Sequence, residues 1–353
     1  MADVAPPHLS GEPVTARRGF FWVGVEQAAL PAGTVPRGQM FVQWEAPPEV
    51  TKPYPLVLVH GGGGQGTDWL GTPDGRPGWA TFLLEEGYAV YVVDRPGHGR
   101  SPFHPDVLGP AGGVFTYELV LALFTAAAGG PMAHPTAHLH TQWPGSGGLD
   151  DPAVDQFAAG TGPMLADAAA AHALEQARGA ALLDAIGPAV LITHSAGGPM
   201  GWLTADARPA LVKGIVAIEP LGPPFLDNPE LGLSLPWGLT AAPLRFDPPA
   251  AAPAEIGRAM TDTPGGPVTL QADPPRSLPN LRETPIAVVD AEASLFSHVD
   301  GATVAFLRQA GCAVEHLRLA DHGVHGNGHL MMLERNNREA LAPILGWLDS
   351  AGL

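Results

Sequence analysis

The sequence predicts an α/β protein with a mostly parallel central sheet, and two observations support this. Five short runs are continuously apolar, which is typical of strands that helices cover on both faces. These runs are residues 56–59, 89–93, 190–193, 215–218 and 286–289. Segments with helical composition lie between them, and this alternation favours right-handed crossovers between parallel strands.

Five segments are predicted to be helices, namely residues 78–86, 164–186, 196–207, 295–310 and 338–348. The alanine-rich segment 164–186 has the strongest helical pattern, because it holds no glycine before Gly179. Residues 19–25 and 38–44 are aromatic and β-branched runs around a turn-rich stretch, which predicts an antiparallel pair. Residues 313–319 alternate in polarity, as a half-exposed strand near a sheet edge would.

Two segments interrupt the alternation, residues 103–163 and 221–281. Each is about sixty residues long, is rich in Pro, Gly and Ala, and follows the carboxyl end of a predicted strand. Loops of this length in a compact domain are usually functional lids or caps. We therefore expect one domain over residues 1–353, with both segments forming a composite cap.

Composition excludes several classes of protein. Of the 353 residues, 45% are hydrophobic and 15% are charged, so the chain can bury a large core and is not disordered. The net charge of −17 disfavours nucleic acid and anionic membrane surfaces as partners. The single cysteine, Cys312, excludes an intrachain disulfide and a cysteine-based zinc site.

No stretch of the sequence has the apolar length of a membrane span, and the first residues do not read as an export signal. The location is open: cytoplasmic as the sequence is written, or secreted or periplasmic if a signal was removed. The oligomeric state is open as well, including a homo-oligomer.

The most specific signal is the run Val190 to Gly198, in which an apolar strand leads into Ser195 between small residues and then into a helix. This is nearly the G-x-S-x-G nucleophile elbow, with Thr193 in place of the usual first glycine. In such a turn the amide of Ala196 points at a developing oxyanion. A plain strand-to-helix turn with Ser195 as the helix N-cap is the structural alternative.

A glycine-rich run, His60 to Gly66, follows the first buried strand. Glycines there let backbone amides approach a reacting carbonyl, which makes Gly62 and Gly63 candidate oxyanion-hole donors. The run also fits G-x-G-x-x-G, a dinucleotide fingerprint. That interpretation requires a helix opening at Gly66, whereas turn residues follow closely, so we do not favour it.

A third motif, Asp94 to Ser101, closes the next buried strand with the pattern D-x-x-G-x-G-x-S. Together with the glycine-rich run and the serine elbow, it resembles the α/β-hydrolase superfamily over nearly the whole chain. The Glu219-Pro220 pair and the segment 328–334 most resemble bacterial carboxylesterases whose triad acid is a glutamate after strand six. The resemblance implies an α/β-hydrolase fold, with about eight strands flanked by helices and cap insertions.

The superfamily order of serine, acid and histidine places the base in the loop after the last strand. His322, His325 and His329 are the candidates, and His329 best matches the family pattern. Two residues compete for the acid: Glu219 ends the sixth strand and Asp290 ends the seventh. The superfamily more often uses the second position, but the resembled esterases use the first, so we predict Glu219 with Asp290 as the alternative.

The predicted reaction is hydrolysis of a carboxylic ester through an acyl-enzyme on Ser195, with no cofactor and a small-molecule ester as the partner. Amidase, lactonase or acyltransferase chemistry would use the same triad, and a non-catalytic binding protein of this fold is a further alternative. Histidines at 322, 325 and 329 with Asp321, and the pair His138 and His140, could hold a metal. The serine elbow needs none, so we predict no metal site.

Overall fold

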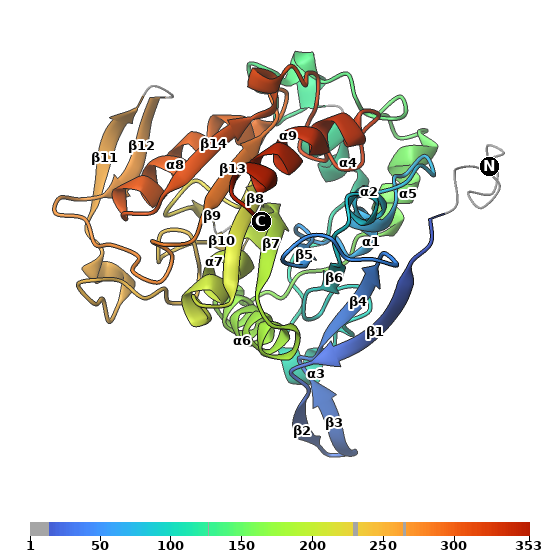
Figure 1. Cartoon of the computed structure of the whole chain (residues 1–353). Helices are drawn as coiled ribbons and strands as arrows, with labels where there is room; N and C mark the ends of the chain where they lie inside the picture. Colours follow the sequence, from blue (N-terminus) through green and yellow to red (C-terminus); the bar gives the residue numbers. More distant parts are fainter. Residues whose placement is uncertain (1–13, 126, 229–231, 264–265) are drawn as a thin grey trace.

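The computed structural model describes residues 14–125, 127–228, 232–263 and 266–353. Its centre is an eight-stranded sheet in the order β1-β4-β6-β5-β7-β8-β13-β14 (Figure 1). Strand β4 pairs antiparallel with β1 and with β6, and the remaining neighbours are parallel. The strands are β1 (Arg17–Val23), β4 (Met40–Ala46), β6 (Val90–Asp94), β5 (Leu56–Val59), β7 (Ala189–His194), β8 (Val212–Ile218), β13 (Ile286–Asp290) and β14 (Val314–Arg318).

Helices cover both faces of this sheet, as the apolar strand runs require. Within β5, Leu56 and Leu58 pack into the core under α2 (Trp79–Glu85) and α9 (Asn337–Ser350). Val57 and Val59 face the opposite core, under α6 (Ala168–Ile186), α7 (Gly198–Ala207) and α8 (Asp300–Gln309). The predicted fold class is confirmed.

The element predictions fail mainly at boundaries. Helix α6 begins at Ala168 rather than at residue 164, because the side chain of Asp167 caps it by accepting a hydrogen bond from the Ala170 amide at 3.0 Å. Leu165, just before it, forms an isolated bridge with Ala111. The turn-rich stretch between β1 and β4 holds a further hairpin, β2 (Glu26–Leu30) with β3 (Gly33–Arg37), which projects from the body (Figure 1).

The two interrupting segments carry short elements of their own. Segment 103–163 contains α3 (Pro105–Leu108), α4 (Tyr117–Val120), the π-helical turn η2 (Leu121–Thr125), the 3-10 turns η3 (Ala127–Gly129) and η4 (Ala137–Leu139), and α5 (Pro152–Ala159). Segment 221–281 contains β9 (Asp227–Asn228), β10 (Leu233–Ser234), η6 (Pro253–Glu255), β11 (Arg258–Thr263) and β12 (Gly266–Gln271).

Four further short helices lie in the loops: α1 (Thr67–Leu70), η5 (Ser195–Gly197), η7 (Leu295–His298) and η8 (Leu319–His322). Within the described part of the chain, no helix is long and apolar enough to cross a membrane.

Candidate active site

Ser195 lies at the sharp turn between β7 and α7, and its backbone is strained. Its φ angle is +52°, in the left-handed region that side chains other than glycine rarely occupy. The side chain is half-buried. The N-cap of α7 is Gly197 and not Ser195. No side chain forms a capping hydrogen bond at the start of η5 or of α7. The N-cap interpretation of Ser195 is therefore wrong, and strain of this kind indicates a functional position.

Two glycines make room for this turn. A Cβ on Gly197 would lie 2.5 Å from the carbonyl oxygen of His60, so only glycine lets the turn meet the end of β5. Thr193 replaces the usual first glycine of the elbow, and its methyl group faces Gly201 of α7. A Cβ on Gly201 would lie 3.0 Å from that methyl carbon. The absence of a side chain on Gly201 in α7 thus leaves room for the Thr193 side chain.

The glycine-rich loop after β5 lies against the elbow. A Cβ on Gly61 would lie 3.1 Å from Cβ of Ser195, and one on Gly62 would lie 3.3 Å from Cβ of Ala196. Gly63 has a φ of +63° and faces the ring of Phe115, 2.5 Å from where its own Cβ would be. The candidate oxyanion residues therefore meet at one place, at the carboxyl edge of the sheet.

A buried arginine ties this loop to the elbow. Arg95 donates to the carbonyl oxygens of Gly61 at 2.7 Å and Ala196 at 3.2 Å, and it pairs with Glu175 at 2.7 Å. Its backbone amide donates to Nε2 of His60 at 2.9 Å, so the neutral His60 ring donates from Nδ1 to the Gly61 carbonyl. Burial, together with the charge of Arg95, holds the pKa of His60 well below 6.5 and keeps it neutral.

Glu219 follows β8 with a φ of +41°, so it too sits in the left-handed region. Its carboxylate is completely buried and has three partners. The amide of Ala291 donates to Oε1 at 2.9 Å, the hydroxyl of Ser294 donates to Oε2 at 2.6 Å, and Nδ1 of His329 lies 2.5 Å from Oε2. Glu219 thus holds the imidazole of His329 through Nδ1.

The ring of His329 is packed among other rings. Phe296 stacks on it with centroids 4.1 Å apart and an interplanar angle of 17°, and Phe124 lies nearly parallel at 5.5 Å. The ring of His194, the residue before Ser195, is 4.4 Å away. Nε2 of His194 also lies 3.0 Å from the carbonyl oxygen of His329. These contacts place His329 beside the elbow.

Burial disfavours the charged form of both members of this pair. It lowers the pKa of His329 from 6.5 to about 3, while the charge of Glu334 acts in the opposite direction. Burial also raises the pKa of Glu219 well above 4.5, against the hydrogen bonds from Ser294 and Ala291, which lower it. Burial thus favours a neutral imidazole at His329. The Ser195 hydroxyl forms no hydrogen bond with any residue that the structure describes.

The alternative residues lie elsewhere. Asp290 pairs with Nε2 of His316 at 2.5 Å and does not hydrogen-bond to His329. His325 is exposed and contacts Glu292 at 3.2 Å, and His322 is exposed as well.

Across the described ranges, no group of three or more His, Cys, Asp or Glu side chains is arranged to hold a metal. A short helix, α1, follows Gly66, but it ends after one turn at Gly71, where the turn residues noted in the sequence begin.

Several contributors were not predicted from the sequence. Ser294 and the stacking rings of Phe124 and Phe296 are among them, because no local pattern links these residues to His329, although Phe296 falls in the predicted helix 295–310. The pairing of Arg95 with Glu175 could have been predicted from the sequence. Glu175 lies in an apolar helix and Arg95 in a motif at a strand end, and a buried charge at either position needs a partner.

Comparisons with known proteins identify the family of the chain. Residues 54–255 match the model of the α/β-hydrolase fold family, and the chain belongs to that family. It is 40% identical over 351 residues to the probable secreted lipase phiG of Fungal sp. (strain ATCC 74256), covering 98% of this chain and 92% of the relative. This kinship supports the expected enzyme class, a carboxylic ester hydrolase.

A solved structure, described as the atomic resolution structure of a novel bacterial esterase, has the same fold. It superimposes with a TM-score of 0.68 at 24% identity, over 98% of this chain and 99% of that one.

Proposed function

We propose that this protein is a serine carboxylesterase in which Ser195 is the nucleophile, His329 the general base and Glu219 the acid that orients the base. The observation that carries the proposal is the 2.5 Å contact between Glu219 and Nδ1 of His329, beside a strained serine elbow. A serine hydroxyl is a weak nucleophile unless a neighbouring base accepts its proton.

The tautomer of His329 follows from its partner. Because the Glu219 carboxylate accepts the proton of Nδ1, Nε2 carries a lone pair and can accept the Ser195 proton. An approach of the serine side chain to Nε2 would complete this contact, as catalytic hydrogen bonds often tighten only when substrate binds. The hydroxyl, free of other partners among the described residues, is available for it.

The reaction would proceed in two halves. As Oγ of Ser195 bonds to the ester carbonyl carbon, its proton passes to Nε2 of His329. The tetrahedral oxyanion then collapses, the bond to the alcohol oxygen breaks, and Nε2 returns the proton to the leaving alcohol. Water attacks the resulting acyl-enzyme by the same route, giving the carboxylic acid and free Ser195.

The oxyanion would be held by backbone amides of Ala196 and of Gly62 or Gly63. The close approach of this loop to the elbow supports the assignment, as does Arg95, which engages the carbonyls of Gly61 and Ala196 and so fixes the orientation of both peptide segments. Donors that are fixed before the reaction need no rearrangement when the charge develops, which makes them effective.

Segments 103–163 and 221–281 would form the cap of a single hydrolase domain. From the first come Phe115, which faces Gly62 and Gly63, and Phe124, which lies against the His329 ring; Met164 follows directly and also faces Gly62. These apolar side chains favour an uncharged ester substrate. The lipase relative is named as secreted, which favours the exported alternative for this chain. Assay of culture medium against cell lysate from the native host tests that point.

The direct test is Ser195→Ala. We expect hydrolysis of a chromogenic short-chain ester to fall by at least about 10⁴-fold, with unchanged thermal unfolding. A phosphonate probe should label the wild-type protein once, at Ser195, and leave the variant unlabelled. Retained turnover in the folded variant would refute the mechanism, and a wild-type protein that neither hydrolyses esters nor takes the label would be a binding protein of this fold.

A further inference from the structure

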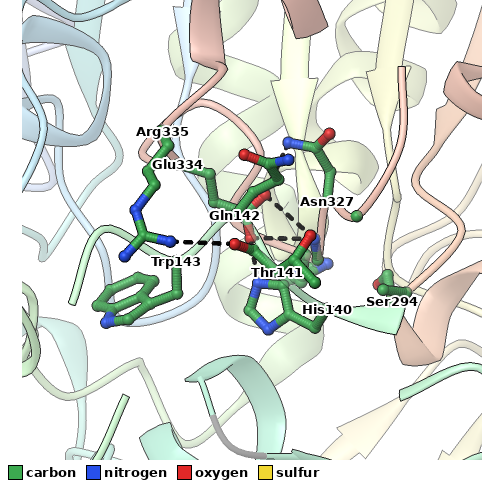
Figure 2. Close-up of polar contacts among 12 residues, drawn as sticks. His140, Thr141, Gln142, Trp143, Ser294, Asn327, Glu334 and Arg335 are labelled. Carbon is green, nitrogen blue, oxygen red and sulfur yellow. Dashed lines mark hydrogen bonds and ion pairs between the residues drawn. The ribbon is translucent and has the colours of Figure 1, made fainter. Parts of the chain in front are cut away.

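Behind the candidate base lies a second carboxylate that the reaction scheme does not use. Glu334 is completely buried, and its carboxylate receives hydrogen bonds from two parts of the chain. Asn327 Nδ2 donates at 2.8 Å and the Gly328 amide at 3.0 Å, both from the loop that carries His329. His140 lies 2.6 Å away through Nε2, from segment 103–163. Figure 2 shows these groups converging.

The tautomer of His140 is fixed by this arrangement. A carboxylate can only accept hydrogen bonds, so Nε2 of His140 carries the proton and donates it to Glu334. Gly328 has no side chain at the point where these groups meet: a Cβ there would lie 3.0 Å from Nε2 of His140 and 3.1 Å from Oε1 of Glu334. Loop, carboxylate and imidazole are therefore in close contact.

The same stretch of segment 103–163 also holds the loop by its backbone. The carbonyl oxygen of Gly326 accepts from the amides of Thr141 at 2.9 Å and Gln142 at 3.2 Å. On the other side of His329, the backbone amide of Arg335 donates to the carbonyl oxygen of Gln142 at 2.8 Å. The guanidinium of Arg335 donates to the carbonyl oxygen of Thr141 at 3.2 Å (Figure 2). Residues 140–142 thus attach to the chain on both sides of His329.

The two glutamates near His329 act at different points. Glu219 contacts the imidazole itself, whereas Glu334 holds the side-chain amide of Asn327 and the backbone amide of Gly328, the two residues that lead into His329. The position of Nε2 depends on both, because a ring anchored at Nδ1 can still swing if its backbone moves. Displacements of about 1 Å at a catalytic group can cost about 100-fold in rate.

We propose that Glu334 is a positioning residue for His329, and that His140 completes it, so that segment 103–163 contributes to the alignment of the base as well as to the cover of the site. This inference rests on the proposed function. It differs from a purely structural role in its consequence: loss of Glu334 lowers kcat while the protein stays folded and KM changes little.

The test compares Glu334→Ala, Glu334→Gln and His140→Gln with a matched control, His316→Gln. His316 also contacts a buried carboxylate, that of Asp290, at 2.5 Å, but among the described residues no hydrogen bond joins it to the loop of His329. We expect kcat on the chromogenic ester to fall about 10- to 100-fold in Glu334→Ala. Glu334→Gln should recover part of this loss, since the amide keeps an acceptor for Gly328. His140→Gln should lose only a few-fold, and His316→Gln should match the wild type.

The pH profile gives a second readout. The charge of Glu334 favours protonated His329 and raises its pKa, so Glu334→Gln should move the acid limb of kcat/KM to lower pH. A third readout needs no turnover: the low-field proton resonance of the contact between His329 and Glu219 should persist in His316→Gln and shift or broaden in Glu334→Ala.

Several outcomes overturn the inference. Folded Glu334→Ala with wild-type kcat, or an unchanged low-field resonance in that variant, would show that Glu334 is only structural. So would an equal loss in His316→Gln. Failure of the proposed function looks different, because then the wild-type protein has no Ser195-dependent turnover, while the resonance still reports whether Glu334 positions the ring.

Discussion

Two buried carboxylates at the ends of neighbouring strands each contact a histidine. Glu219 follows β8 and contacts His329, while Asp290 ends β13 and contacts His316, each at 2.5 Å. The second pair lies within the sheet, because His316 belongs to the adjacent strand β14. The first reaches across to a loop beside Ser195, with two further donors on the carboxylate. The comparison shows that a contact between a histidine and a carboxylate does not by itself identify a candidate triad. The nearby serine and the further donors on the carboxylate distinguish Glu219 from Asp290.

The largest expected difference between the pairs is catalytic. Glu219→Gln should lower kcat by about 10³- to 10⁴-fold, because an amide no longer holds His329 in the correct tautomer. Asp290→Asn should change kcat by less than about 10-fold, since its partner is not the base. Steady-state kinetics on both variants measures this. The reverse ranking would assign the acid to Asp290.

The buried ion pair of Arg95 and Glu175 extends the comparison from catalysis to the stability of the fold. Both side chains are nearly inaccessible, at 4% and 3% exposure. Glu175→Ala should lower the free energy of unfolding by roughly 3–5 kcal/mol, because it leaves the Arg95 charge buried without its partner. Urea denaturation measures this value. A loss below 1 kcal/mol would mean that water or the carbonyl groups of Gly61 and Ala196 replace the glutamate.

A smaller effect should follow from the extra donors on Glu219. Ser294→Ala removes the hydroxyl that donates to Oε2 at 2.6 Å, and hydrogen bonds to charged groups are worth about 1.5–3 kcal/mol. We expect kcat to fall about 10- to 100-fold with little change in KM. Ser297→Ala, in the same turn but bonded only to the carbonyl of Ser294, is the control and should behave as wild type.

The smallest predicted effect concerns pH and stability. Burial, followed by the charge of Arg95, lowers the pKa of His172 from 6.5 to about 3, and Nδ1 of this ring accepts a hydrogen bond from Ala241 at 2.9 Å. Below pH 6.5 the unfolded chain binds a proton there that the folded chain does not, so stability falls as the pH falls from about 6.5 towards 3. His172→Asn keeps an acceptor and cannot be protonated.

The loss of unfolding free energy between pH 7 and pH 5 should therefore shrink by about 2 kcal/mol in His172→Asn. Urea denaturation at both pH values gives the number. His322→Asn, at an exposed position, should leave the pH dependence as in the wild type. An equal change in both variants would argue against burial as the cause.

Much of the fold was predictable because parallel strands with two covered faces are apolar throughout. The same property placed Ser195, Glu219 and Asp290 at strand ends, where a polar residue interrupts an apolar run. It could not decide between the two acids, since both end such runs. Their partners come from loops: His329 is 110 residues from Glu219.

The remaining parts of the site depend on contacts between distant loops. His140 and Glu334 are separated by 194 positions, and no sequence pattern at either residue predicts their contact. Ser294 caps the 3-10 turn η7 and Phe296 lies within it, and their importance to the site comes from Glu219 and His329, which they contact. The predicted start of α6 was too early because alanine content marks helical composition and not the Asp167 cap.

The contact between Thr193 and Gly201 constrains how this chain can diverge. A methyl group from the strand occupies the space that a side chain on the helix would need. An alanine at position 201 is thus expected to be less destabilising with glycine at position 193 than with threonine there, whereas glycine at both positions leaves a void. Laboratory evolution of the elbow should therefore recover changes at positions 193 and 201 as linked substitutions.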